Sequence, residues 1–158
     1  MTTTDYSTLW DLEQIKKLRI LYSHYLDTNE LDKLTSLFTE DAECDFARGG
    51  IWKGHEALRR GFAEAHTQYD TNRHGTYPYL HSVTNHWVEL TGPATAEGSC
   101  YLLDWVTSLV DRSPLLLLGI YVDAYRKDAG IWRFSQCRID FIWPNRDIRG
   151  SVGNGHKS

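Results

Sequence analysis

Asp27 is a carboxylate at a position where helices disfavour one. It ends "LYSHYLD" (residues 21–27), the point at which a helical pattern of apolar residues stops. The carbonyl groups at the end of a helix carry partial negative charge, so an acid there needs another reason to be present. One reason is local, because "DTNE" (27–30) resembles a capping box in which Asp27 would cap a second helix. The other is that Asp27 positions a group that does chemistry.

His81 is the candidate base. It lies in "LHSVTNHW" (80–87), a predicted strand, on the same side as Val83, Asn85 and Trp87. An unperturbed imidazole has a pKa of about 6.5, so a small shift makes it a general base near neutral pH. The alternative is a hydrogen-bonded histidine in a wall of aromatic side chains.

The seven histidines do not predict a metal site. His81 and His86 lie five residues apart on one predicted strand, so strict alternation puts them on opposite faces. The chain contains neither His-Glu-x-x-His nor Cys-x-x-Cys, and no glycine-rich phosphate loop follows a strand. We therefore expect neither a metal nor another cofactor.

Composition limits the class of protein. With 158 residues, 41% of them hydrophobic and 24% charged, the chain fits one globular domain with its own core. The net charge is −4 without a basic stripe, which argues against a nucleic-acid partner. The longest apolar run, "PLLLLGIYV" (114–122), is too short to span a membrane, and "MTTTDYST" lacks the features of a signal peptide. Three widely spaced cysteines indicate reduced, buried thiols and a cytoplasmic protein.

The first half of the chain has helical periodicity. A helix from about residue 8 to 27 carries an apolar stripe, and a short helix follows over 30–38. A short strand over 40–47 and a turn lead to a third helix over 55–69. The stripe of the first helix consists of Leu12, Ile15, Leu18, Tyr22 and Leu26.

The second half predicts four strands at about 78–91, 95–110, 115–127 and 131–143, separated by turn sequences. Helices followed by long antiparallel strands indicate an α+β fold in which one bent sheet packs on the helices and encloses a pocket. We expect a single domain over 1–147 and a flexible tail over 148–158.

The sequence resembles the SnoaL-like proteins of the nuclear transport factor 2 (NTF2-like) superfamily. The resemblance rests on "LYSHYLDTNELDKLTSLFTEDAE" (21–43) with "GIWKGHEAL" (50–58), and on the strands "YLHSVTNHWVEL" (79–90) and "AGIWRFSQCRIDF" (129–141). It covers about residues 8 to 144 and implies a cone formed by a bent, mainly antiparallel sheet on three N-terminal helices. Since this fold hosts many activities, it specifies function only weakly.

A narrower resemblance concerns the site. The histidine of "LHSVTN" with an upstream acid at a helix end is similar to the His–Asp pair of scytalone dehydratase, lindane dehydrochlorinase and bile acid 7α-dehydratase, which are lyases without cofactors. The last of these is the most similar in site pattern. It implies catalytic roles for Tyr22, Asp27, His81, Asp104 and Arg138, of which the last two depend on strand register.

Each of these residues also has a structural alternative. Tyr22 lies on the apolar stripe and would pack in the core. Arg138 would pair with Asp140, two residues further along the same strand. Asp104 lies on a largely apolar strand face, where it would either have a raised pKa and act as an acid or pair with Arg138.

Together these features predict a lyase, specifically a dehydratase, that acts on a small apolar ring compound such as a steroid, polyketide or aromatic catabolite. Asp27 would orient His81 as the general base. The alternatives are a ketosteroid-type isomerase or polyketide cyclase, and a non-catalytic ligand-binding or assembly subunit. Because relatives associate through the sheet, the resemblance also implies a homo-oligomer, a trimer in preference to a dimer.

Overall fold

A computed structural model describes residues 6–46, 49–70, 79–106 and 115–149. The elements are α1 (Tyr6–Asp27), α2 (Leu31–Ser36), β1 (Phe38–Asp45), β2 (Ile51–Lys53), α3 (Gly54–Tyr69), β3 (Tyr79–Gly92), β4 (Thr95–Val106), β5 (Leu115–Asp128) and β6 (Ile131–Trp143). The predicted elements are present in the predicted order. The end of the predicted strand 95–110 and nearly all of the predicted tail lie outside the described residues.

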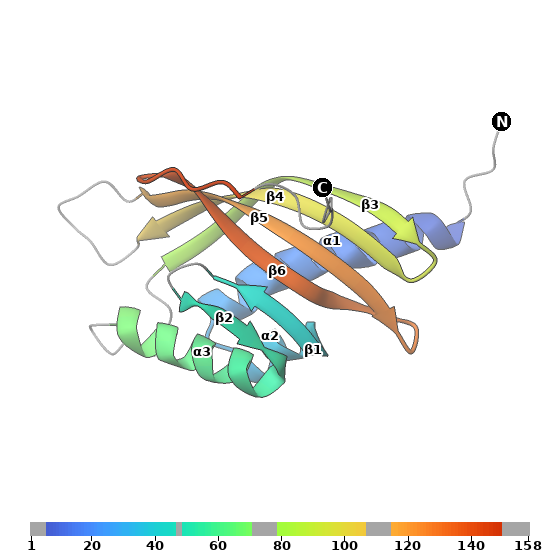
Figure 1. The fold of residues 1–158 in the computed structure, drawn as a ribbon, viewed down its shortest axis with the longest axis horizontal. Coiled ribbons are helices and arrows are strands. Elements are labelled where there is room, and N and C mark those ends of the chain that lie inside the picture. The colour runs from blue at the N-terminus through green and yellow to red at the C-terminus, as the bar shows by residue number, and fades with distance from the viewer. Residues whose placement is uncertain (1–5, 47–48, 71–78, 107–114, 150–158) are drawn as a thin grey trace, which may run out of the picture.

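The fold is α+β, as expected. One six-stranded sheet has the order β2-β1-β6-β5-β4-β3, and its strands pair antiparallel except for β1 with β6. Figure 1 shows α1 running across one face of the curved sheet, with α2 and α3 beside β1 and β2 at one end. We call the face that packs on α1 the inner face. None of the described helices is long and apolar enough to cross a membrane.

The short second helix differs from the prediction. It ends at Ser36, and Phe38 opens β1 instead of closing the helix. Phe38 is fully buried and packs on Phe134 with ring centroids 5.2 Å apart. The spacing of apolar residues predicted that the helix continues to Phe38. In the structure Phe38 is instead the buried first residue of a strand.

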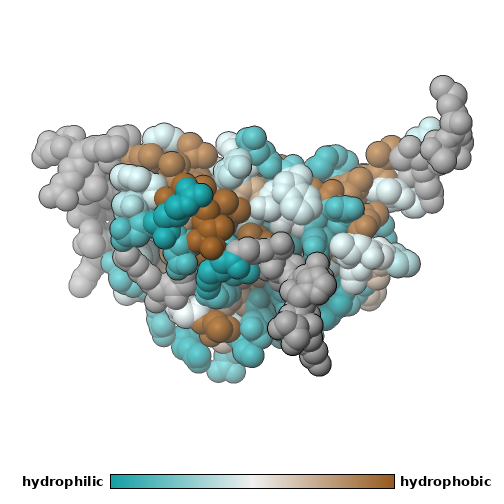
Figure 2. Space-filling view, turned by 45° about the horizontal axis from the view of Figure 1, so that its top comes forward, coloured by the Kyte–Doolittle hydropathy of each residue, from teal (hydrophilic) through white to brown (hydrophobic). Residues whose placement is uncertain are grey.

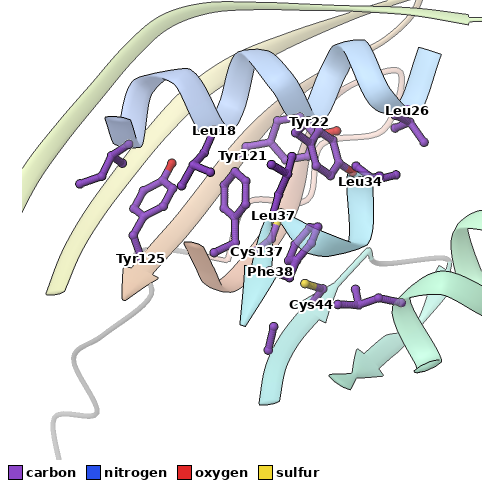
Figure 3. Close-up of a cluster of buried hydrophobic side chains, with 14 of the residues drawn as sticks. Leu18, Tyr22, Leu26, Leu34, Leu37, Phe38, Cys44, Tyr121, Tyr125 and Cys137 are labelled. Atoms are coloured by element: carbon purple, nitrogen blue, oxygen red, sulfur yellow. The ribbon is translucent and has the colours of Figure 1, made fainter. Parts of the chain in front are cut away.

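The core lies between α1 and the inner face of the sheet (Figure 3). The predicted stripe is confirmed at Ile15, Leu18, Tyr22 and Leu26, which are buried. Arg19 is buried on the same helix face with no exposed surface, which the stripe did not predict. The three cysteines are free and buried, as expected.

Two irregularities in the strands change which side chains face the core. In β3 the pairing with β4 shifts between Thr84 and Trp87, and Asn85 has a φ of 53°. The extra residue reverses the alternation, so Trp87 leaves the side of His81 and is 52% exposed. The prediction that His81 and Trp87 share a face is therefore wrong.

The same shift overturns the argument that separated the two histidines. His86 points inward, and its Nε2 lies 3.3 Å from the Tyr125 hydroxyl. His81 and His86 therefore share the inner face, although they contact different partners there. Among the described residues, no group of three histidine, cysteine or acidic side chains could hold a metal ion.

In β6 the pairing with β5 shifts at Ser135, because Phe134 and Gln136 pair with the consecutive residues Tyr125 and Ala124. After this bulge, Cys137 and Ile139 face the core. Arg138 and its neighbour at position 140 consequently lie on the outer face.

Candidate functional site

The Asp27 carboxylate contacts both the side chain and the backbone of His81. The Asp27 Oδ1 atom lies 2.6 Å from His81 Nδ1, and the backbone N–H of His81 donates to Asp27 Oδ2 at 3.1 Å. A carboxylate only accepts hydrogen bonds, so Nδ1 carries the hydrogen and the lone pair of the neutral imidazole lies at Nε2. The chain thus fixes both the position and the tautomer of His81.

The capping alternative for Asp27 is not realised. The residue at the N-cap of α2 is Glu30, and no side chain caps that helix. Thr28 donates to the His24 carbonyl oxygen at 2.7 Å and to the Glu30 carboxylate at 3.1 Å. The end of α1 is therefore satisfied by Thr28, and both oxygens of Asp27 point to His81.

Asp104 approaches the other side of the imidazole. It pairs with His81 across β3 and β4, and its Oδ2 lies 3.8 Å from His81 Nε2. The residue is 6% exposed, and Oδ1 has no hydrogen-bond partner among the described residues. Burial raises the pKa of Asp104 to about 6, an effect that His81 opposes and Asp27 reinforces. The imidazole therefore lies between two carboxyl groups with different surroundings.

Tyr22 is 2% exposed and packs among aromatic rings at the bottom of the fold's cavity. Burial raises the pKa of its phenol well above the ordinary range, so the hydroxyl stays protonated. A buried neutral phenol can donate a hydrogen bond to a ligand oxygen at any physiological pH.

Arg138 does not join this group. On the outer face its guanidinium binds Asp140, with Nε 3.0 Å from Oδ1 and Nη2 3.0 Å from Oδ2. Arg149 also binds Asp140 and reaches Asp45. Arg138 therefore pairs with Asp140, as its structural alternative predicted. The pair lies on the outer face because the bulge at Ser135 reverses the direction of the side chains that follow it.

A cavity of about 600 Å³ opens between α1, α3 and the inner face. Of the five candidate residues, Tyr22 and His81 line it. Asp27 and Asp104 do not line it and contact His81 from behind the wall. The principal lining residues on opposite sides are Tyr22, Phe62, His81, Tyr121, Ile139 and Phe141.

Tyr121 and Trp52 line the cavity but were not singled out from the sequence. The signal for Tyr121 was its position in "GIYVDAY" (119–125), where Tyr121, Asp123 and Tyr125 alternate and all prove buried. Trp52 packs against Gly61 of α3, where a Cβ atom would lie 2.4 Å from the indole ring. A glycine at that point of the helix therefore makes room for the cavity wall.

The family described as the SnoaL-like domain matches residues 7–138. No curated protein sequence matches the chain.

Solved structures share the fold at low identity. A candidate scytalone dehydratase from Novosphingobium aromaticivorans is 21% identical, with a TM-score of 0.73 over 96% of this chain and 97% of that chain. A hexachlorocyclohexane dehydrochlorinase, LinA type 2, is 19% identical, with a TM-score of 0.72 over 98% and 100%. An NTF2-like protein with a cystatin-like fold from N. aromaticivorans is 17% identical, with a TM-score of 0.74 over 89% and 87%. These similarities establish the NTF2-like fold.

Proposed function

The chain belongs to the SnoaL-like domain family, and from this premise we propose that it is a cofactor-independent lyase. The activity is the dehydration of a small, mostly apolar ring compound that carries a carbonyl group. The observation that carries the proposal is the 2.6 Å contact between Asp27 and His81 at the wall of the cavity. Two of the structures with this fold are named as a dehydratase and a dehydrochlorinase, which are eliminating enzymes.

The proposed reaction begins at His81 Nε2, which takes a proton from the carbon next to the substrate carbonyl. The C–H electron pair moves toward the carbonyl and gives an enolate, which then forms the new C=C bond as the hydroxyl on the following carbon leaves. That hydroxyl takes up a proton from Tyr22, which lines the cavity, and departs as water. The carbonyl itself acidifies the C–H bond, so the step needs no cofactor.

The two carboxyl groups stabilise the charge that this step creates. After proton transfer, His81 is an imidazolium with Asp27 at Nδ1 and Asp104 near Nε2. Only 6% of the His81 side chain is exposed, so water screens this charge poorly and the carboxylates stabilise it strongly. Arg138, on the outer face, has no part in this mechanism.

An isomerase or cyclase would use the same base, since it differs only in what happens to the enolate. A non-catalytic subunit would be favoured by a cone filled with side chains and by an Asp27 that faces solvent. The cavity of about 600 Å³ and the buried His81 argue for chemistry instead.

A screen of hydroxylated cyclic ketones tests the proposal. We expect one or more β-hydroxy ketones to lose water, detected by the ultraviolet absorbance of the conjugated enone and by a mass loss of one water. A β,γ-unsaturated ketone belongs in the same screen. If that compound isomerises while no hydroxy ketone loses water, the isomerase replaces the dehydratase, and loss of water that persists in His81→Ala removes His81 from the mechanism.

We also propose that the chain forms a homo-oligomer through the outer face of the sheet, a trimer in preference to a dimer. This face exposes Leu80, Trp87 and Tyr101 to between 47% and 52%. Figure 2, which brings the top of Figure 1 forward, shows hydrophobic side chains in brown among hydrophilic ones. Leu80 and Trp87 of β3 flank Thr84, the residue that pairs with Tyr101 of β4, so the three side chains lie on adjacent strands. Contiguous exposed apolar surface of this kind marks association sites. Sedimentation of the purified protein at the mass of one chain would contradict this proposal.

A further inference from the structure

Arg19 and Asp123 form an ion pair in the middle of the apolar core. Neither side chain has exposed surface, and Arg19 Nε donates to Asp123 Oδ2 at 3.1 Å. A second donor, Nη2, binds Asp123 Oδ1 and lies 3.3 Å from the Cys137 sulfur. Nη1 has no hydrogen-bond partner among the described residues. An ion pair in such a place is costly to bury, and apolar residues of similar size would often serve stability as well.

The guanidinium lies against the rings of the cavity floor. The Arg19 Cζ atom is 4.0 Å from the ring centre of Tyr121 and 4.6 Å from that of Tyr22. These two rings meet edge to face with centres 5.7 Å apart, and both residues line the cavity. In Figure 3, Tyr121 extends from β5 toward α1, which carries Tyr22. The cation therefore touches two of the aromatic rings that line the cavity.

The negative end of the ion pair points elsewhere. Asp123 accepts a hydrogen bond of 2.9 Å from the hydroxyl of Tyr125, which lies next to His86. Burial raises the pKa of Tyr125 most, and the negative charge of Asp123 raises it further. At Tyr121, burial also raises the pKa, but there the next influence is Arg19, which lowers it. The pair is thus a fixed dipole with its positive end at the cavity floor.

We propose that Tyr121 donates a hydrogen bond to an anionic oxygen of the ligand, and that the Arg19–Asp123 dipole strengthens this donor from below. This inference rests on the proposed function and extends it. The ligand is a carbonyl compound whose oxygen becomes negative in the reaction, or a stable analogue such as a phenolate. Tyr121 is a further catalytic residue, and Arg19 is a positioning residue that acts through the ring of Tyr121.

The placement fits the elimination. His81 and Tyr121 line the same cavity, so one ring compound can present its C–H group to the imidazole and its carbonyl oxygen to the phenol of Tyr121. This phenol stays protonated because burial raises its pKa well above the ordinary range. A neutral donor that is already in place stabilises a developing oxyanion without the reorganisation that water requires.

Equilibrium binding tests the inference without turnover. We would titrate the full chain with 4-nitrophenol, at a pH at which the free compound is ionised, and with nitrobenzene as a neutral analogue of similar shape. The wild type should bind the phenolate more tightly than nitrobenzene. Tyr121→Phe should weaken phenolate binding by about tenfold or more, because it removes a hydrogen bond to a charged group, and should leave nitrobenzene binding unchanged.

Tyr125→Phe is the matched control. It removes the same kind of hydroxyl from the same strand at similar burial, but outside the cavity, and it should change phenolate binding by less than about threefold. A wild type without preference for the phenolate, or equal losses in the two tyrosine variants, would overturn the inference. Because no turnover is involved, a protein that dehydrates nothing could still bind phenolate through Tyr121, and the reverse also holds.

The role of Arg19 needs a variant that removes both charges, since removing one leaves the other buried and unpaired. Arg19→Met combined with Asp123→Asn keeps an acceptor for the hydroxyl of Tyr125 and removes the dipole. We expect this double variant to weaken phenolate binding several-fold while nitrobenzene binding is retained. If phenolate binding is undiminished, the dipole has no role; if the variant does not fold, Tyr121→Phe still decides the assignment of the donor.

Discussion

Replacing His81 with alanine should lower kcat for the elimination by about 10²-fold to 10⁴-fold, the usual contribution of a general base. KM should change little, because the imidazole is a small part of the cavity wall. Asp27→Asn should lower kcat by about tenfold or more, since an amide neither fixes the Nδ1–H tautomer nor stabilises the imidazolium. Steady-state kinetics on the substrate found by the screen would measure both effects.

His86→Ala is the control for this pair of variants. His86 lies on the same strand and the same inner face, but its Nε2 contacts Tyr125 and it does not line the cavity. Its removal should leave kcat within about threefold of the wild type, because no proton transfer passes through it. Equal losses in His86→Ala and His81→Ala would show that the effect comes from a general disturbance of β3, and the dyad would lose its support.

Asp104→Asn should make the folded protein more stable at neutral pH. Burial raises the pKa of Asp104 from 3.8 to about 6. A carboxyl group whose pKa is higher in the folded state favours folding below its unfolded pKa and loses that contribution as pH rises through the folded pKa. The ionised wild type therefore carries a cost of about 3 kcal/mol above pH 6 to 7, which the amide does not have. Chemical denaturation at several pH values would measure it.

The stabilisation should disappear on acidification. Below about pH 4 the Asp104 carboxyl of the folded wild type is protonated and is therefore uncharged, like the amide of the variant. Asp140→Asn is the matched control, since Asp140 is also nearly unexposed but binds Arg138 and Arg149. That variant should destabilise the protein at neutral pH. If Asp104→Asn is destabilising to the same degree at pH 7.5, Asp104 makes favourable contacts as an anion and the account of its burial is wrong.

Most of the fold follows from periodicity and turn sequences. The helical stripe that contains Ile15 and Tyr22 predicts the buried face of α1, and turns such as "KDAG" (127–130) separate the long strands close to their observed ends. The expected contact between Asp27 and His81 is present at 2.6 Å. Their catalytic role stays a prediction, as do those of Tyr22 and Asp104.

Strand faces were harder to predict, because one inserted residue reverses every later side chain. Nothing in the sequence around Ser135 indicates the bulge that moves Arg138 to the outer face. Asn85 gives a weak signal, since asparagine tolerates positive φ better than most residues, but it does not by itself predict a bulge in β3. Register in the folded sheet is decided by the core, which a single strand does not reveal.

The buried ion pair between Arg19 and Asp123 was not predicted from the sequence, although the position of each residue gives a signal. Arg19 lies next to Leu18 and four residues after Ile15, inside the stripe that α1 buries. Asp123 alternates with Tyr121 and Tyr125 on the inner face of β5. Their sequence separation of 104 residues hides the pairing, which only the packing of α1 on the sheet brings about.

The central claim is that Asp27 holds His81 with its proton at Nδ1, so that the lone pair at Nε2 acts as the base. Nitrogen-15 NMR of labelled protein tests it directly, because protonated and unprotonated imidazole nitrogens differ widely in chemical shift. At a pH at which His81 is neutral, we predict a proton on Nδ1 and none on Nε2 in the wild type, and loss of this preference in Asp27→Asn. A neutral His81 with its proton on Nε2 in the wild type would contradict the account.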